Sequence, residues 1–235
     1  MHAYATPDIT DLRAEIARSL GLTETRGERA FEQECRAYLT DLRWPGGVEC
    51  PRCSESARLL WLASRSKWHC YECRYQFSVT AGTLFHRSHL PVWKWFVAVH
   101  LMLSSPSGLS ANELRRVIGG SYKTAWFAAH RIRAAMSGHG ADLLRDLVDA
   151  ELKRTGAAMP PARAEVDRAS GNVLVRVRRI IGAPHHQLSP KYLHAYIDER
   201  RWRITHSENP HVFRDTIEAL LKGEGLSYDE LVAAV

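Results

Sequence analysis

Four of the five cysteines in the chain form two closely spaced pairs, Cys50-Pro-Arg-Cys53 and Cys70-Tyr-Glu-Cys73. Two thiolates in one tight turn can face a single ion, and two such turns complete a tetrahedron of sulfur ligands around zinc. The sixteen residues between the pairs are a separation typical of such sites. We therefore predict a structural Zn²⁺ held by Cys50, Cys53, Cys70 and Cys73.

Two other interpretations of the paired cysteines are a redox-active dithiol and unliganded buried thiols. A thioredoxin-type redox site needs one Cys-x-x-Cys in a βαβ setting, whereas this chain has two pairs and no such pattern around them. Cys35 lies in the helical pattern FEQECRAYL and is expected to be a packed thiol rather than a fifth ligand. His69 is expected to be a strand residue, because four cysteines already complete the coordination.

The segments around the cysteines predict a small sheet. Residues 59–62 (LLWL) and Trp68 supply strand material on either side of a polar turn at residues 64–67, and YQFSVT at 75–80 supplies a third strand. Such a sheet buries too little apolar surface to be stable without its metal. This combination of elements is a zinc ribbon.

Composition favours a polyanionic partner. The chain has 235 residues, a net charge of +6 and a sequence pI of about 9.2, with arginine carrying most of the positive charge. A basic surplus of this kind is typical of nucleic-acid binding, although a basic surface without a partner explains it too. The N-terminus lacks the features of a signal peptide, and the apolar run VWKWFVAVHLML is too short to span a bilayer. We expect a cytoplasmic protein without a membrane partner.

Helical patterns flank the predicted ribbon. Residues 8–20 and 28–42 show apolar residues at helical spacing before the ribbon, and a helix that begins at Leu90-Pro91 follows it. That third helix is apolar nearly all round and should be buried. We expect its Trp93, Trp95 and Phe96 to belong to the core rather than to stack on bases.

The next two helices form a helix-turn-helix candidate. A capping box at Ser110-x-x-Glu113 starts the first, Gly119-Gly120 ends it, and Ser121 caps a longer helix that reaches Met136. The second helix would enter the major groove by its N-terminal residues, while the first would touch the DNA backbone. The alternative is a helical hairpin with a solvated basic face. The residues expected to contact base edges are Ser121, Tyr122, Lys123, Thr124 and Trp126, and those expected to contact phosphates are Arg115, Arg116, Arg131 and Arg133.

The remaining chain predicts a connector and a mixed C-terminal region. Residues 138–164 form the connector, and RAEVDRASGNVLVRVRRI at residues 163–180 is predicted to form a β-hairpin. A helix is expected at 190–204, where Asp198 and Glu199 are expected to form ion pairs with neighbouring arginines. Two short helices follow, the first beginning at Pro210 and the second at a capping box, Ser227-x-x-Glu230. His185-His186 is expected to serve in a loop or to contact a phosphate.

Several of these segments resemble a known family. FEQECRAYLTDLRWPGGVECPRC, WHCYECRYQFSVTAGTLFHRSHLPVWKWF, SYKTAW and RIRAAM resemble the front half of bacterial insertion-sequence transposases, over roughly residues 28–136. RRIIGAPHHQLSPKYLHAYIDERRWR resembles the closing segment of the same family. The resemblance implies a zinc ribbon and a helix-turn-helix in front of a DDE catalytic domain, and a protein associated with the bacterial nucleoid.

The middle of the chain does not match that family. By resemblance, the catalytic domain has an RNase H-like fold in which three carboxylates bind two metal ions. A sheet of about five strands with its crossover helices requires on the order of a hundred residues. Only about forty separate Met136 from the closing segment. Asp149 and Asp167 are the candidates for a remaining first carboxylate, and no second or third one is recognisable.

The sequence as a whole predicts a mainly helical α+β protein. Its expected parts are N-terminal helices at 1–43, a zinc ribbon at 44–88, a helix-turn-helix region at 89–137, a connector at 138–164 and a remnant of the catalytic domain at 165–235. The favoured hypothesis is a transposase-like protein that binds duplex DNA and has lost its catalytic core. Two alternatives stay open: a Mg²⁺-dependent DNA-nicking transposase completed by another subunit, and a non-functional decay product. Candidate protein partners are a second copy of the chain, in a homo-oligomer, and a transposase subunit.

Overall fold

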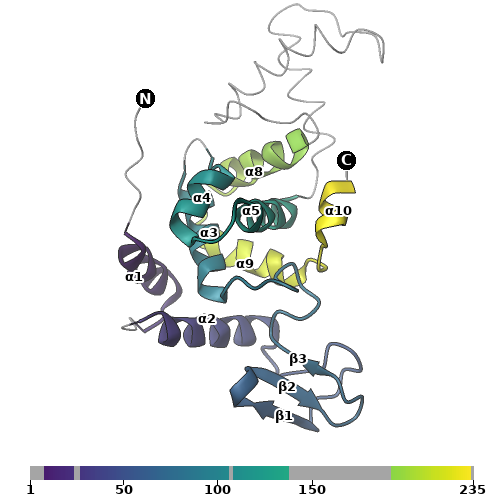
Figure 1. Ribbon diagram of the computed structural model, residues 1–235. Helices are drawn as coiled ribbons and strands as arrows, with labels where there is room; N and C mark the ends of the chain where they lie inside the picture. The colour runs from purple at the N-terminus through teal and green to yellow at the C-terminus, as the bar shows by residue number, and fades with distance from the viewer. Residues whose placement is uncertain (1–7, 24–26, 106–107, 138–191, 234–235) are drawn as a thin grey trace, which may run out of the picture.

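The computed structural model describes residues 8–23, 27–105, 108–137 and 192–233. The predicted connector, the predicted hairpin at 163–180, His185-His186, Asp149 and Asp167 lie outside these residues. Within them the fold is a helical body with a small three-stranded sheet at one end (Figure 1). The mainly helical α+β class is therefore confirmed.

Two helices precede the sheet, as the apolar spacing predicts. Helix α1 (Ile9–Leu20) begins where the Asp8 carboxylate accepts a hydrogen bond from the Thr10 amide, and it ends at Gly21, whose φ of 66° is left-handed. Helix α2 (Glu28–Arg43) ends at Trp44. Both helices face the core with their apolar side chains, which include the buried Leu12, Ile16, Phe31, Cys35 and Leu39.

The sheet contains strands β1 (Leu59–Leu62), β2 (Lys67–Cys70) and β3 (Gln76–Phe77) in the order β1-β2-β3, all antiparallel. The predicted polar turn between β1 and β2 is a short 3₁₀ helix, Ala63–Arg65, followed by Ser66 in a left-handed conformation. The Trp44 ring contacts Trp68 and Phe77 edge-on, and the Arg43 guanidinium donates to the Val79 carbonyl oxygen. These contacts fix the sheet to the end of α2.

Helix α3 (Val92–Ser104) is the centre of the helical body. Eight of its thirteen residues are buried, and they lie on every side of the helix. Trp93, Trp95 and Phe96 are at most 2% exposed, so the prediction that they belong to the core is confirmed. Because α3 is apolar all round, its neighbours α1, α2, α4, α5 and α9 can each bury an apolar face against it.

Helices α4 (Ala111–Ile118) and α5 (Tyr122–Met136) follow, and α5 lies in the middle of the helices in Figure 1. The capping box of Ser110 and Glu113 is present. Helices α8 (Leu193–Thr205) and α9 (Val212–Lys222) pack against α5, and a capping box of Ser227 and Glu230 begins α10 (Tyr228–Ala233). The described C-terminal helices thus share a core with the helices that follow the ribbon. Among the described helices, none is long and apolar enough to cross a membrane.

A buried ion pair joins α5 to α8. The Arg133 Nε atom lies 2.7 Å from Glu199 Oε2, and each side chain is only 2% exposed. A second cation, Arg203, approaches the other oxygen of Glu199 at 3.6 Å. The predicted ion pairing of Glu199 with a neighbouring arginine is therefore present, but its closest partner comes from a helix far away in the sequence.

Glu199→Gln should destabilise the fold strongly, because it removes the charge that compensates two largely buried guanidinium groups. Breaking a buried pair costs about 3–5 kcal/mol, whereas exposed pairs contribute about 0–1 kcal/mol. Glu218→Gln is the matched control, since Glu218 pairs with the exposed Arg214 and Lys222. Urea unfolding of both variants measures the difference, and equally small losses would contradict the role given to Glu199.

Candidate metal centre and nucleic-acid interface

The structure brings together the four cysteines that the spacing singled out. The Sγ atoms of Cys50 and Cys73 lie 3.6 Å apart, as do those of Cys53 and Cys70, and all four lie within 4.8 Å of one another. A zinc ion at about 2.3 Å from four tetrahedral sulfurs requires sulfur–sulfur distances of about 3.8 Å. The arrangement therefore fits a four-coordinate zinc ion with no open position, which is a structural rather than a catalytic site.

Each cysteine pair lies in the same kind of turn. The Cys50 amide donates to the Glu55 carbonyl oxygen at 2.9 Å, and the Cys70 amide donates to the Tyr75 carbonyl oxygen at the same distance. The residue directly after each pair, Ser54 or Arg74, has a left-handed backbone with φ of 59° or 56°. This shared geometry turns both thiols of each pair toward the centre.

Hydrogen bonds, burial and neighbouring sulfurs shift the pKa values of Cys50 and Cys53 in opposite directions. Burial opposes ionisation of Cys50, but hydrogen bonds from the amides of Arg52 and Cys53 outweigh it and lower the pKa of that thiol to about 7. The Glu55 amide favours the Cys53 thiolate, but desolvation and the neighbouring sulfurs outweigh it and raise its pKa to about 12. A divalent cation at the centre stabilises the thiolates and offsets the repulsion between them, although a four-cysteine zinc site keeps a net negative charge.

The apolar interior beside the cluster is small. The buried residues are Cys50, Cys70, Phe77 and Ala81, with half-buried aromatic rings packed around them. Two of those four are the cysteines themselves. The strands therefore depend on the metal for much of their stability.

The remaining candidate ligands lie elsewhere. Cys35 is fully buried in the helical core, where burial raises the pKa of its thiol and keeps it protonated. His69 lies on β2 with its ring edge-on to Tyr71, and its Nδ1 atom is buried without a hydrogen-bond partner in the described residues. Neither residue belongs to the sulfur cluster.

The turn between α4 and α5 is built by two glycines and a lysine. Gly119 and Gly120 have φ of 76° and 81°, a conformation that residues with a side chain rarely adopt. The Lys94 ammonium, from α3, donates to the Ile118 carbonyl oxygen at 2.6 Å and so caps the last turn of α4. Ser121 begins α5, because its hydroxyl accepts a hydrogen bond from the Thr124 amide at 3.1 Å.

Five of the predicted DNA contacts share this exposed end of the helix pair. Ser121, Tyr122 and Lys123 are exposed on the first turn of α5, and Arg115 and Arg116 are exposed on the last turns of α4. Thr124 and Trp126 are half-buried, and the Trp126 ring packs beside His130 and Tyr228. The rest of α5 is surrounded by other helices, so its N-terminal end is the part that a ligand could reach.

Arg131 and Arg133 do not belong to that surface. They are 2% and 1% exposed, respectively. Arg131 donates to the carbonyl oxygens of His86 and Leu226, and Arg133 donates to Glu199 and to the Leu109 carbonyl oxygen. Both guanidinium groups form hydrogen bonds inside the protein, so neither is available to contact DNA. Their helical positions alone could not reveal this, because their partners lie far along the chain.

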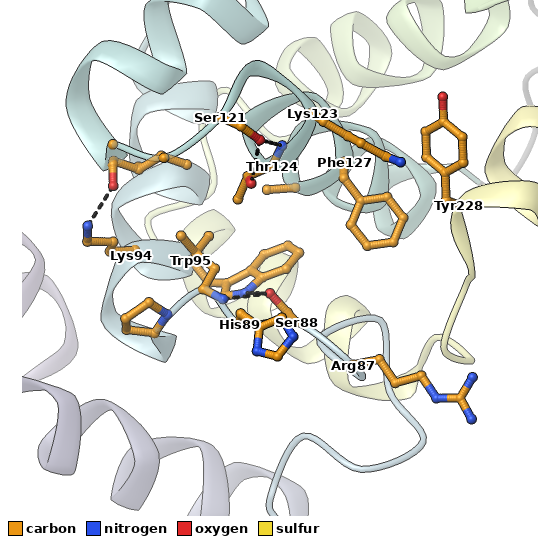
Figure 2. A pocket seen from close by; sticks show the side chains of 16 residues that line it. Arg87, Ser88, His89, Lys94, Trp95, Ser121, Lys123, Thr124, Phe127 and Tyr228 are labelled. Carbon is orange, nitrogen blue, oxygen red and sulfur yellow. Dashed lines mark hydrogen bonds between the residues drawn. The ribbon is translucent and has the colours of Figure 1, made fainter.

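A cavity of about 430 Å³ opens beside the start of α5 (Figure 2). It lies between the loop at residues 87–91 and the side of α5 that carries Lys123 and Phe127. The Lys123 ammonium lies 4.3 Å from the centre of the Tyr228 ring, a cation–π contact with α10. Sequence reasoning missed Lys94 and Tyr228, since only the fold brings them to this place.

Comparison with known proteins identifies the ribbon. Residues 31–76 match the transposase zinc-ribbon domain. The match begins within α2, includes all four cysteines and ends in β3. The chain is transposase-like, as its resemblance to insertion-sequence transposases implies.

A relative supports the same conclusion. A protein described as an uncharacterized protein in transposable element ISH50, from Halobacterium salinarum, is 30% identical over 112 residues. The alignment covers 46% of this chain and 37% of the relative, so the chain spans little more than a third of that protein's length. No solved structure matches the chain.

The purified chain should contain one tightly bound zinc ion, and Cys70→Ser should release it, because three sulfurs no longer close the tetrahedron. Atomic absorption measures the metal content, and the change in tryptophan fluorescence, to which Trp44, Trp61 and Trp68 of the ribbon contribute, follows the loss of ribbon structure. Cys35→Ala is the matched control and should keep its zinc. A Cys70→Ser variant that retains a full equivalent of zinc would contradict the assigned ligands.

Proposed function

We propose that this protein binds duplex DNA through the exposed end of the α4–α5 pair. The observation that carries the proposal is the gathering of Arg115, Arg116, Ser121, Tyr122 and Lys123 on one accessible surface of a chain with a transposase zinc ribbon. Arginine and lysine at a helix end can neutralise phosphates, and short polar side chains beside them can reach base edges.

The geometry of α5 determines which of its residues can take part. A recognition helix contacts base edges with its N-terminal residues, and the N-terminal turn is the exposed part of α5. We assign base contacts to Ser121, Tyr122, Lys123 and Thr124. Arg115 and Arg116 lie on α4 beyond the glycine turn, where they can contact the backbone on either side of the groove.

The zinc ribbon has a supporting role in this proposal. It is joined to α2 through Trp44 and Arg43, and α2 packs on α3, which carries the Lys94 cap of the α4–α5 turn. Besides Arg58, which pairs with Glu72, its outer surface adds exposed cations for backbone contacts: Arg52, Arg65, Lys67 and Arg74. Metal binding and DNA binding are therefore linked through a continuous set of packed elements.

We confine the proposal to DNA binding and infer that the DDE catalytic core has been lost. In the part of the chain that the structure describes, the group that could hold a metal ion is the cysteine cluster. Thiolates suit zinc and not Mg²⁺, which takes oxygen ligands. Mg²⁺-dependent nicking that disappears on Asp149→Ala or Asp167→Ala would instead favour an active transposase.

The double variant Arg115→Gln, Arg116→Gln should weaken the binding of all duplexes alike. Each lost phosphate contact reduces the slope of log K against log salt by about 0.9, so the double variant should lose nearly 2 units of slope. Fluorescence anisotropy over a range of KCl concentrations measures it. Lys222→Gln, an exposed cation on α9, is the control and should leave the slope unchanged. Binding that does not depend on salt would exclude the proposal.

Lys123→Met should change sequence preference rather than overall affinity for DNA. A base-edge contact contributes about 1–3 kcal/mol of discrimination, so the preferred site should lose that advantage over unrelated duplexes. Selection from a random duplex library, carried out for both proteins, reports the preference. An identical preferred site in the variant would show that Lys123 does not read bases.

A further inference from the structure

The cavity beside α5 combines the two properties that a nucleotide requires. Its walls are apolar and aromatic, and its rim carries cationic groups from three separate segments. Of the sixteen described residues that line it, none is acidic. The apolar part comprises Leu90, Pro91, Trp95, Ile118, Phe127 and Ala128, and the basic part comprises Arg87, His89, Lys94 and Lys123.

The cationic groups at the rim retain unused hydrogen-bond donors. Within the described residues, the Lys94 ammonium makes one hydrogen bond, to the Ile118 carbonyl oxygen. Lys123 contacts the face of the Tyr228 ring, and Arg87 is exposed on the loop. An ammonium has three donors and a guanidinium has five, so these groups can still bind an anion. Burial and the charges of Arg87 and Arg131 lower the pKa of nearby His86, which agrees with a positive local potential.

The walls suit a flat ring. Phe127 projects from α5 toward the loop at residues 87–91, as Figure 2 shows, while the Arg131 guanidinium lies 4.1 Å from its ring centre. Trp95 donates its indole N–H to the Ser88 hydroxyl at 3.3 Å and so keeps its polar atom satisfied while it lines the cavity. A cavity of about 430 Å³ lies within the range of about 300–1,000 Å³ that small-ligand sites occupy. A phosphate alone would leave the apolar walls without a partner.

We propose that this cavity binds one unpaired nucleotide at the end of a DNA strand, with the base against Phe127 and the phosphate at the basic rim, within reach of the exposed Arg87 side chain. A paired base is stacked within the duplex and cannot enter, whereas an unpaired base can stack on an aromatic side chain. Ser121, Lys123 and Thr124 line the cavity and also form the proposed duplex surface. A duplex that is bound at the start of α5 close to its own end would have that strand end beside the cavity. This inference rests on the proposed duplex binding.

The experiment compares a blunt hairpin duplex with the same duplex carrying a two-nucleotide single-stranded end, by fluorescence anisotropy on the full zinc-loaded chain. The single-stranded end should improve affinity about tenfold, in the range that stacking of one base provides. Phe127→Leu keeps the apolar volume but removes the flat ring, and Arg87→Gln removes an exposed cation without touching the core. Both variants should lose the tenfold gain and bind the blunt duplex as before, while Lys222→Gln should keep the gain.

Thymidine monophosphate and inorganic phosphate are the competing probes. The monophosphate should abolish the gain at concentrations where phosphate does not, and its own binding, followed by NMR, should be lost in Phe127→Leu. Equal competition by phosphate would overturn the role of the base. Blunt-duplex binding with no gain from the single-stranded end would overturn this inference alone. Absence of binding to either duplex would overturn the proposed function. If the monophosphate also failed to bind, the proposed nucleotide site in the cavity would be overturned too.

Discussion

The burial of α3 on every side is the constraint on which the described structure depends. A helix that is apolar all round cannot lie at a surface, so the chain must supply a layer of helices to cover it. Helices α1 and α2 come from before the ribbon, α4 and α5 follow α3 directly, and α9 comes from near the C-terminus. The helices that pack on α3 also place the two candidate sites. The ribbon lies at the end of α2, and the glycine turn between α4 and α5 lies beside the Lys94 ammonium of α3.

The metal centre and the helical body are stabilised in different ways. The helical body is held by a large apolar core with edge-on aromatic contacts such as Phe85 with Trp95. The ribbon has a very small core, and its four cysteine sulfurs lie close enough together to bind one cation. Zinc therefore contributes to folding in the ribbon itself, while the helical body can retain its packing independently. The ribbon and the helical body meet at the aromatic contacts of Trp44, so a change in the ribbon can affect the helical body there.

Much of this arrangement could be predicted from local patterns. The spacing of the cysteines, the capping boxes and the glycine pair at 119–120 each act over a few residues, and the structure shows the corresponding turns and helix ends. The fates of Arg131 and Arg133 could not be predicted in this way. From the helical pattern alone, both arginines would be predicted to lie exposed to solvent. Their burial depends on carbonyl oxygens and a carboxylate from segments distant in the sequence. The cavity was not foreseeable either, because its residues come from four parts of the chain.

The two buried guanidinium groups of α5, those of Arg131 and Arg133, also constrain the order in which parts of the protein can fold during synthesis. Arg133 is separated by 66 residues from its carboxylate, and Arg131 by 95 residues from the Leu226 carbonyl oxygen. Until the ribosome has released those segments, the helix holds two cations that have no place in an apolar interior. The N-terminal helices and the ribbon can assemble as they emerge, but the body around α5 must wait for nearly the whole chain. The packing around α5, the helix proposed to contact DNA, is therefore completed last.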